Sequence, residues 1–136
     1  MSQARIRAAF ESRLAGWADH EGLPVVWQNV GAGLPDGEHL RAFLMPGETV
    51  SRDLAGDNRS YRGVFHVSVF TPPGVGAGRA EMLAGALDLL FPAMLRMDSG
   101  GLGVLVMTPM TAKPAVQEPD WYSVPVSCRY AAEENT

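Results

Sequence analysis

The chain has 136 residues, of which 46% are hydrophobic and 19% charged, values that suit one globular domain and argue against disorder. Its net charge is −4 and its 11 basic residues form no run, so it lacks the basic patch that a phosphate-backbone binder needs, and free nucleic acid is not an expected partner. The single cysteine, Cys128, excludes an internal disulfide.

The first residues alternate charged and apolar side chains. A signal peptide needs an unbroken apolar segment. Here the apolar residues are interrupted by Arg5, Arg7, Glu11 and Arg13. No apolar run approaches the roughly 20 residues that cross a bilayer. We therefore expect no membrane partner and a protein made and kept in the cytoplasm.

The first half of the chain predicts one helix and three strands. Residues 2–20 have the apolar spacing of an amphipathic helix, which Gly22 and Pro24 end. Strands are expected over 25–29 and 39–45, on either side of a turn-rich stretch. The best-defined strand is 61–71, and its apolar residues on both faces predict a central place in the sheet.

Between the last two of these strands, residues 46–60 are polar and without apolar periodicity. A loop of this length is uncommon inside a compact domain, and such loops tend to be functional or mobile. We therefore predict a loop here and consider it a candidate contact element.

The second half predicts one helix and two strands. A helix is expected over 78–94, with Pro92 in its last turn, followed by a strand over 104–108. The last strand, 121–130, contains Pro125, which predicts an edge position or a bulge. The tail from Ala131 is expected to fray.

These elements give the order α-β-β-β-α-β-β in a single domain, 1–136. They predict an α+β fold, a mixed and mostly antiparallel sheet of about five strands with two helices packed on one face. Following the chain direction, loops gather at both ends of the sheet, a shape suited to stacking between partners.

One glycine-rich turn raises the question of phosphate binding. Gly74–Gly78 leaves a strand and enters a helix, where backbone N–H groups can point at an anion. The third glycine of a dinucleotide fingerprint is replaced by Arg79 or Glu81, and the lysine of a P-loop is missing. A plain chain reversal is the favoured interpretation.

No catalytic, cofactor-binding or metal site is predicted. The three histidines have no helical i, i+4 spacing, and one cysteine cannot build a structural zinc centre. Cys128 falls on the apolar face of a strand, which is typical of a core residue. Among the tryptophans, Trp121 opens a strand on its polar side and is the best candidate for a protein contact.

Taken in order, several segments resemble the phage tail-terminator family, the minor tail protein U-like proteins. They are Leu23–Asn29, His39–Ala42, Tyr61–Val69, Pro72–Gly76, Phe91, Gly103–Val104, Pro109, Gln117 and Tyr122–Val126. The resemblance covers most of the chain and lies in order and spacing rather than in one motif. Gln28 departs from it, since an acidic residue is expected before Asn29.

The resemblance implies a structural role without catalysis: a hexameric ring that ends tail-tube polymerisation and offers a face to the head. The implied partners are copies of itself, the tail-tube protein and head-completion proteins, first in the host cytoplasm and then in the virion of a phage or prophage. Our candidate interface residues are Arg52, Asp53, Asp57, Arg59 and Trp121. Two alternatives stay open: a head–tail joining protein, and a small-molecule or nucleotide-binding domain that uses Gly74–Gly78.

Overall fold

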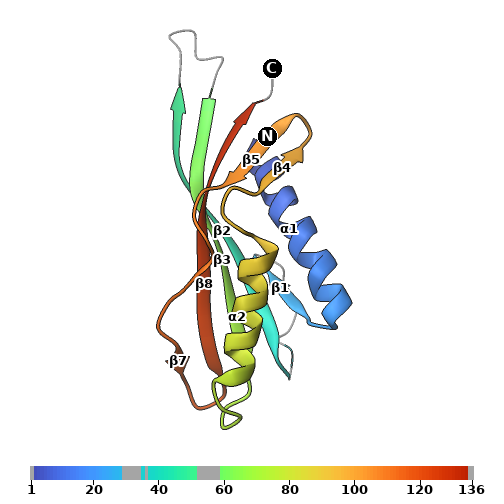
Figure 1. The fold of residues 1–136 in the computed structure, drawn as a ribbon, viewed down its shortest axis with the longest axis vertical. Helices are drawn as coiled ribbons and strands as arrows, with labels where there is room; N and C mark the ends of the chain where they lie inside the picture. The colour runs from blue at the N-terminus through green and yellow to red at the C-terminus, as the bar shows by residue number, and fades with distance from the viewer. Residues whose placement is uncertain (1, 29–34, 36, 52–58, 135–136) are drawn as a thin grey trace.

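The computed structural model describes residues 2–28, 35, 37–51 and 59–134, in which two helices lie on one face of a long, curved sheet (Figure 1). The helices are α1 (Ser2–Glu21) and α2 (Gly78–Leu90). The strands are β1 (Val25–Trp27), β2 (His39–Ser51), β3 (Arg59–Thr71), β4 (Arg96–Ser99), β5 (Leu102–Val106), β6 (Thr111–Ala112), β7 (Val116–Gln117) and β8 (Tyr122–Glu134).

The strand order along the sheet is β1-β2-β3-β8-β5-β4, and β6 and β7 also pair with β8. β1 pairs with β2 in parallel, whereas the other pairs among the described strands are antiparallel. The predicted α+β class and the central position of β3 are confirmed. The expected number of about five strands is too low, because β6 and β7 have two residues each, too few to show a periodic pattern.

The core lies between the helices and one face of the sheet. Alternate residues of the three long strands point into it, among them Leu40, Phe65 and Val126, each at most 1% exposed. Phe10 of α1 is at the centre, since its ring stacks on Phe65 at 4.5 Å and lies 5.5 Å from that of Tyr130. Neither of the two described helices lies on the opposite face of the sheet.

Two long strands extend beyond their predicted ends. β2 continues to Ser51 and β3 starts at Arg59, so much of the predicted 46–60 loop is a two-stranded arm. Pairing shifts at Pro46 and resumes at Thr49, which is how a bulge absorbs a proline and a glycine within a strand. The fraying predicted from Ala131 is also wrong, because β8 pairs with β5 as far as Glu134.

The helix predicted over 78–94 ends four residues early. After Leu90, Phe91 still donates its N–H to Leu87, but Pro92 cannot continue the hydrogen-bond ladder. Met94 then has a φ of 72° and donates its N–H to Val106. After this contact the chain enters β4. The sequence of this strand is mostly polar and does not show the apolar alternation that predicts a strand.

Pro125 lies inside the sheet rather than at its edge, because β8 is flanked by β3 on one side and by β5, β6 and β7 on the other. Its carbonyl accepts the N–H of Lys113, so its own nitrogen faces the interval between β6 and β7. The missing N–H therefore falls where the pairing on that side of β8 is interrupted between β6 and β7, which explains how an inner strand accommodates a proline.

Candidate protein-interaction surfaces

The five predicted contact residues do not form one site. Arg52, Asp53 and Asp57 lie outside the described residues. Arg59 is exposed at the start of β3, while Trp121 precedes β8 at the opposite end of the sheet, since Ser60 pairs with Glu133 and Thr71 with Tyr122. Figure 1 shows that the β4–β5 turn lies near the Arg59 end and the turn before α2 at the other end.

Trp121 is only partly exposed, because it packs in an aromatic cluster. The Trp121 and His39 rings are perpendicular, with their centroids 4.9 Å apart. The His39 ring stacks on that of Phe70, and these centroids are also 4.9 Å apart. On Phe70 rests the guanidinium of Arg41, 4.0 Å from the ring centroid. The indole therefore has a packing role. Because Trp121 is still partly exposed, its role in a protein contact stays a proposal.

The His39 side chain in this cluster is fully buried, with hydrogen bonds at both nitrogens. Nδ1 donates to the carbonyl of Gly37 at 2.9 Å, which leaves Nε2 to accept the N–H of Arg41 at 3.3 Å. Burial, aided by the charge of Arg41, lowers the pKa of His39 below its ordinary value. The ring is therefore a neutral structural group at neutral pH.

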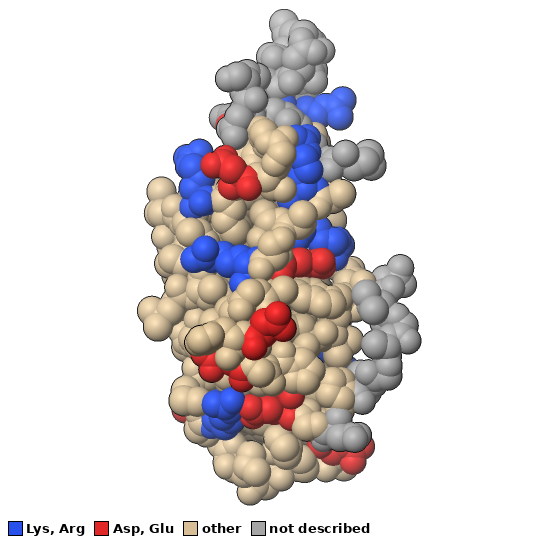
Figure 2. Space-filling view, turned by 90° about the vertical axis from the view of Figure 1, so that its right-hand side faces the viewer, with Lys and Arg blue, Asp and Glu red and all other residues tan. Residues whose placement is uncertain are grey.

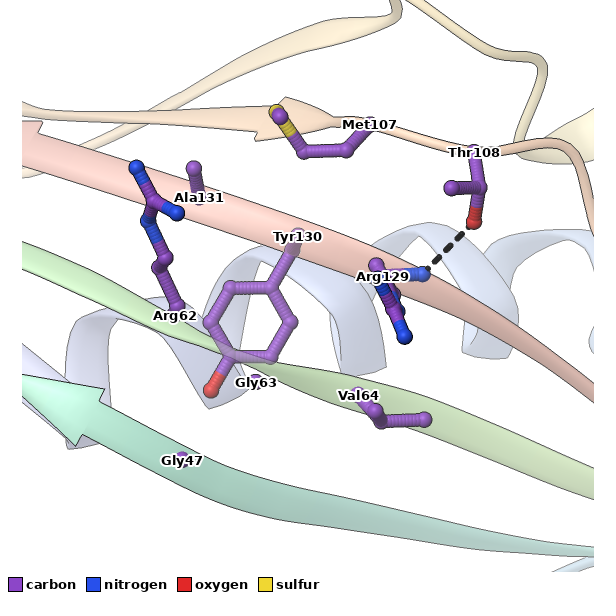
Figure 3. A pocket seen from close by; sticks show the side chains of 9 residues that line it. All are labelled: Gly47, Arg62, Gly63, Val64, Met107, Thr108, Arg129, Tyr130 and Ala131. Atoms are coloured by element: carbon purple, nitrogen blue, oxygen red, sulfur yellow. Dashed lines mark hydrogen bonds between the residues drawn. The ribbon is translucent and has the colours of Figure 1, made fainter.

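The uncovered face of the sheet contains a depression of about 360 Å³ (Figure 3). Arg62 and Val64 line it from β3 and Arg129 from β8, while Met107 borders it from the segment after β5. The backbone N–H of Arg129 donates to the Thr108 hydroxyl at 2.9 Å, the dashed line of Figure 3. The result is an apolar floor flanked by guanidinium groups.

Two adjoining depressions share this lining and extend it into what we call the basic groove. One reaches Arg96 and Glu133 through Arg62 and Met107, and the other reaches Lys113 through Val64 and Arg129. The groove is defined by Arg62, Val64, Arg96, Met107, Lys113, Arg129 and Glu133. Four basic side chains and one carboxylate give it a positive charge, although the whole chain has a net charge of −4.

The outer side of α2 has the opposite character. Met82 is 57% exposed and Leu89 is 82% exposed, one above the other at i, i+7. Beside this apolar row, Glu81 and Asp88 form a second row with the same spacing, and both are exposed. Gly85 lies between the rows, with open space where a side chain would be. We call these five residues the acidic α2 face.

Charge is also unevenly distributed along the molecule. In Figure 2, arginine and lysine side chains gather toward the upper end and carboxylates toward the lower end. Exposed or partly exposed acidic residues at the lower end include Asp19, Glu21 and Glu38. Glu38 forms an ion pair with Arg79 at 2.6 Å, which lowers the pKa of the carboxyl. On the face that Figure 2 shows, basic side chains therefore predominate toward one end and carboxylates toward the other.

The groups that the sequence analysis considered for chemistry have structural roles. Cys128 is buried, and burial raises the pKa of its thiol to about 12. Within the described residues, no group of three or more potential metal ligands is found. Gly74 and Gly76 both have a φ of 83°, a conformation that glycine adopts readily, so the turn needs them for its backbone path. None of the described helices has the length and apolarity to cross a membrane.

Two helices on one face of a mixed sheet, with a charged groove on the other, define a small α+β protein whose most prominent surface features are this groove and the acidic α2 face. Its sequence from residue 5 to residue 130 matches the family described as phage tail terminator protein. A solved structure of a protein 49% identical in sequence covers 97% of this chain and 96% of its own, with a TM-score of 0.83. A search of the curated proteins gave no match. The chain belongs to the phage tail terminator family and is a structural protein of phage tails that associates with other virion proteins.

Sequence reasoning missed the basic groove and the acidic α2 face. The groove joins residues of β3, β4 and β8 that are far apart in the chain, and only the strand order brings them together. The α2 face had a local signal, because Met82 and Leu89 fall outside the core stripe of Leu83 and Leu87.

The structure also explains how Gln28 can stand where the family pattern has an acidic residue. Its side-chain oxygen accepts N–H groups from Arg7 and Leu44, as a carboxylate would.

Proposed function

We propose that this protein caps the phage tail tube as a ring, ends polymerisation of the tube and provides the face to which the head joins. Membership of the tail terminator family is the observation that carries the proposal. The partners are copies of the chain, the tail-tube protein and a head-completion protein. We also propose that the ring contains six copies of the chain.

The shape and charge of the molecule support this role. A capping ring needs lateral surfaces that fit its neighbours and two ends that fit different proteins. The long sheet supplies a frame, and its ends differ in charge on the face that Figure 2 shows. Contacts between identical subunits that repeat head to tail close into a ring when the rotation between them is suitable.

The two-stranded arm is our candidate for docking to the tube or the head. It projects beyond the helical layer in Figure 1, and Arg59, which pairs with Ser51 at the far end of its described strands, is exposed. Arg52, Asp53 and Asp57 belong to the same segment of the sequence and stay candidates. Reversing Arg52 and Arg59 to Glu is expected to disturb tail length or head joining, and unchanged particles would remove the arm from the proposal.

The test of the function is electron microscopy of particles from a phage that lacks this gene. A terminator predicts overlong tails, because nothing stops the tube. A head–tail joining protein of similar fold predicts tails of ordinary length that stay unattached. Normal infectious particles would contradict both roles.

A further inference from the structure

We propose that the ring is held together by the acidic α2 face of one subunit docking in the basic groove of the next. The proposal rests on the ring-forming function and names the lateral contact within it. Its two halves lie on opposite faces of the sheet, α2 over the core side and the groove on the uncovered side. A contact between two different surfaces of one chain is heterologous and repeats from subunit to subunit.

The exposed apolar side chains support a pair of matching surfaces. Met82 and Leu89 stand out on α2, while Met107 and Met45, each 46% exposed, lie on the other side of the molecule at or beside the groove. Methionine and arginine are enriched in protein interfaces, where flexible thioethers adapt to a partner surface. Burying both sets against each other removes apolar surface from water at each junction of the ring.

Charge complementarity selects a second copy as the occupant. Glu81 and Asp88 flank the apolar row of α2, and Arg62 and Arg129 flank the floor of the groove. Seven residues of helix separate the two carboxylates by about 10 Å. Arg62 and Arg129 lie on neighbouring strands two residues out of register, which separates their Cα atoms by about 8 Å. Two ion pairs can therefore form together, given the reach of arginine side chains.

The arrangement also orients the subunit in the ring. α2 runs along the long axis of the sheet (Figure 1), and the groove runs over the same strands. A helix that packs along its neighbour's groove keeps the long axes of successive subunits side by side. Both ends of every subunit then face the two openings of the ring, where the tube and the head bind.

The test uses two charge-reversed variants in the phage that lacks the gene. The first is Glu81→Lys with Asp88→Lys, and the second is Arg62→Glu with Arg129→Glu. Each variant alone turns two attractions into repulsions, so each is expected to lower the yield of particles with normal tails by about tenfold or more. Expressed together, they restore the yield, because each contact between unlike variants pairs opposite charges.

The outcomes separate the contact from the function. If wild-type protein restores normal tails and each variant alone does so equally well, the docking is wrong and the function stands. If the co-expressed variants fail although each is folded by circular dichroism, the docking is again wrong. If tails are normal without the gene, the proposed function fails first. A matched control, Glu118→Lys with Asp120→Lys, makes the same charge change on exposed residues outside both surfaces and is expected to assemble rings.

A cross-link gives a second, direct measurement. Cysteines placed at Gly85 and Val64 would face each other across the contact, and Cys128 is buried and does not compete. Oxidised particles are expected to give a ladder of linked subunits in a denaturing gel. Moving the first cysteine to Gly16 on α1, another exposed helical glycine with open space, is expected to abolish the ladder. An equal ladder from both would contradict the docking.

Discussion

The side chain of Tyr130 lies against the backbone of Gly63, its partner in register on the adjacent strand. A methyl group at position 63 would collide with the Tyr130 hydroxyl and would approach the carbonyl oxygen of Met45 to 2.6 Å. The aromatic ring occupies the space that a side chain would fill, as Figure 3 shows. The glycine thus allows β3 and β8 to pack closely at the point where the core adjoins the basic groove.

The first prediction is that Gly63→Ala destabilises the fold. Because the methyl group meets backbone as well as the tyrosine ring, the strands must move apart, at a cost of about 1–3 kcal/mol or more. The measurement is the free energy of unfolding in urea. Gly16→Ala is the control: nothing lies within 4 Å of the added methyl, so a stability gain of up to about 1 kcal/mol is expected.

A second prediction concerns Phe10, which contacts the rings of Phe65, Phe91 and Tyr130. Phe10→Ala leaves a cavity among three aromatic rings and is expected to cost about 3–5 kcal/mol. Leu89→Ala, on the exposed outer side of α2, is expected to change the stability of the isolated subunit by less than about 0.5 kcal/mol. Equal losses from both would show that the core is wrongly placed.

Local pattern predicted the elements better than their ends. The apolar spacing of α1 and the alternation of β3 depend on burial that the sequence displays directly. β4 was missed because its exposed residues are polar and its pairing depends on β5 and on a tight turn at Gly100 and Gly101, both with positive φ. The extension of β8 past Ala131 depends on β5, a contact between segments distant in the chain.

A third prediction follows from His39. Its pKa is lowered by burial, so the neutral ring stabilises the fold fully above pH 6.5, and this stability is lost as the pH falls through the lowered value. His39→Gln keeps a neutral side chain that can donate and accept, and it is expected to weaken the loss of thermal stability between pH 7.5 and pH 5. The same pH profile is measured for His66→Gln as a comparison, because burial also lowers the pKa of His66. An unchanged pH profile in the His39 variant would contradict this role.

A fourth prediction is that Cys128 does not react in the folded protein. Burial raises the pKa of its thiol to about 12, so almost no thiolate exists at pH 8 and access is blocked. A disulfide reagent at pH 8 is expected to modify the thiol only after denaturant is added. Rapid modification of the native protein would show that β8 opens far more readily than its pairing indicates.

The candidate surfaces were less predictable than the fold. Trp121 was found from its place in the sequence, but its packing on His39 and Phe70 requires the β2–β3 register. Arg62 and Arg129 are 67 positions apart, and only the antiparallel pairing of β3 with β8 places them on one groove. Surfaces made from several strands carry no short motif, which is why the family resemblance rather than any local pattern indicated the role.

The most direct measurement of the central claim is the length of tail tubes polymerised in vitro from the tube protein of the same phage, with and without this protein. We expect a substoichiometric amount of wild-type protein to stop growth, so that tubes are short and carry it at one end in electron micrographs. Tubes that reach the same lengths with and without it would contradict the proposal that this protein ends the tail.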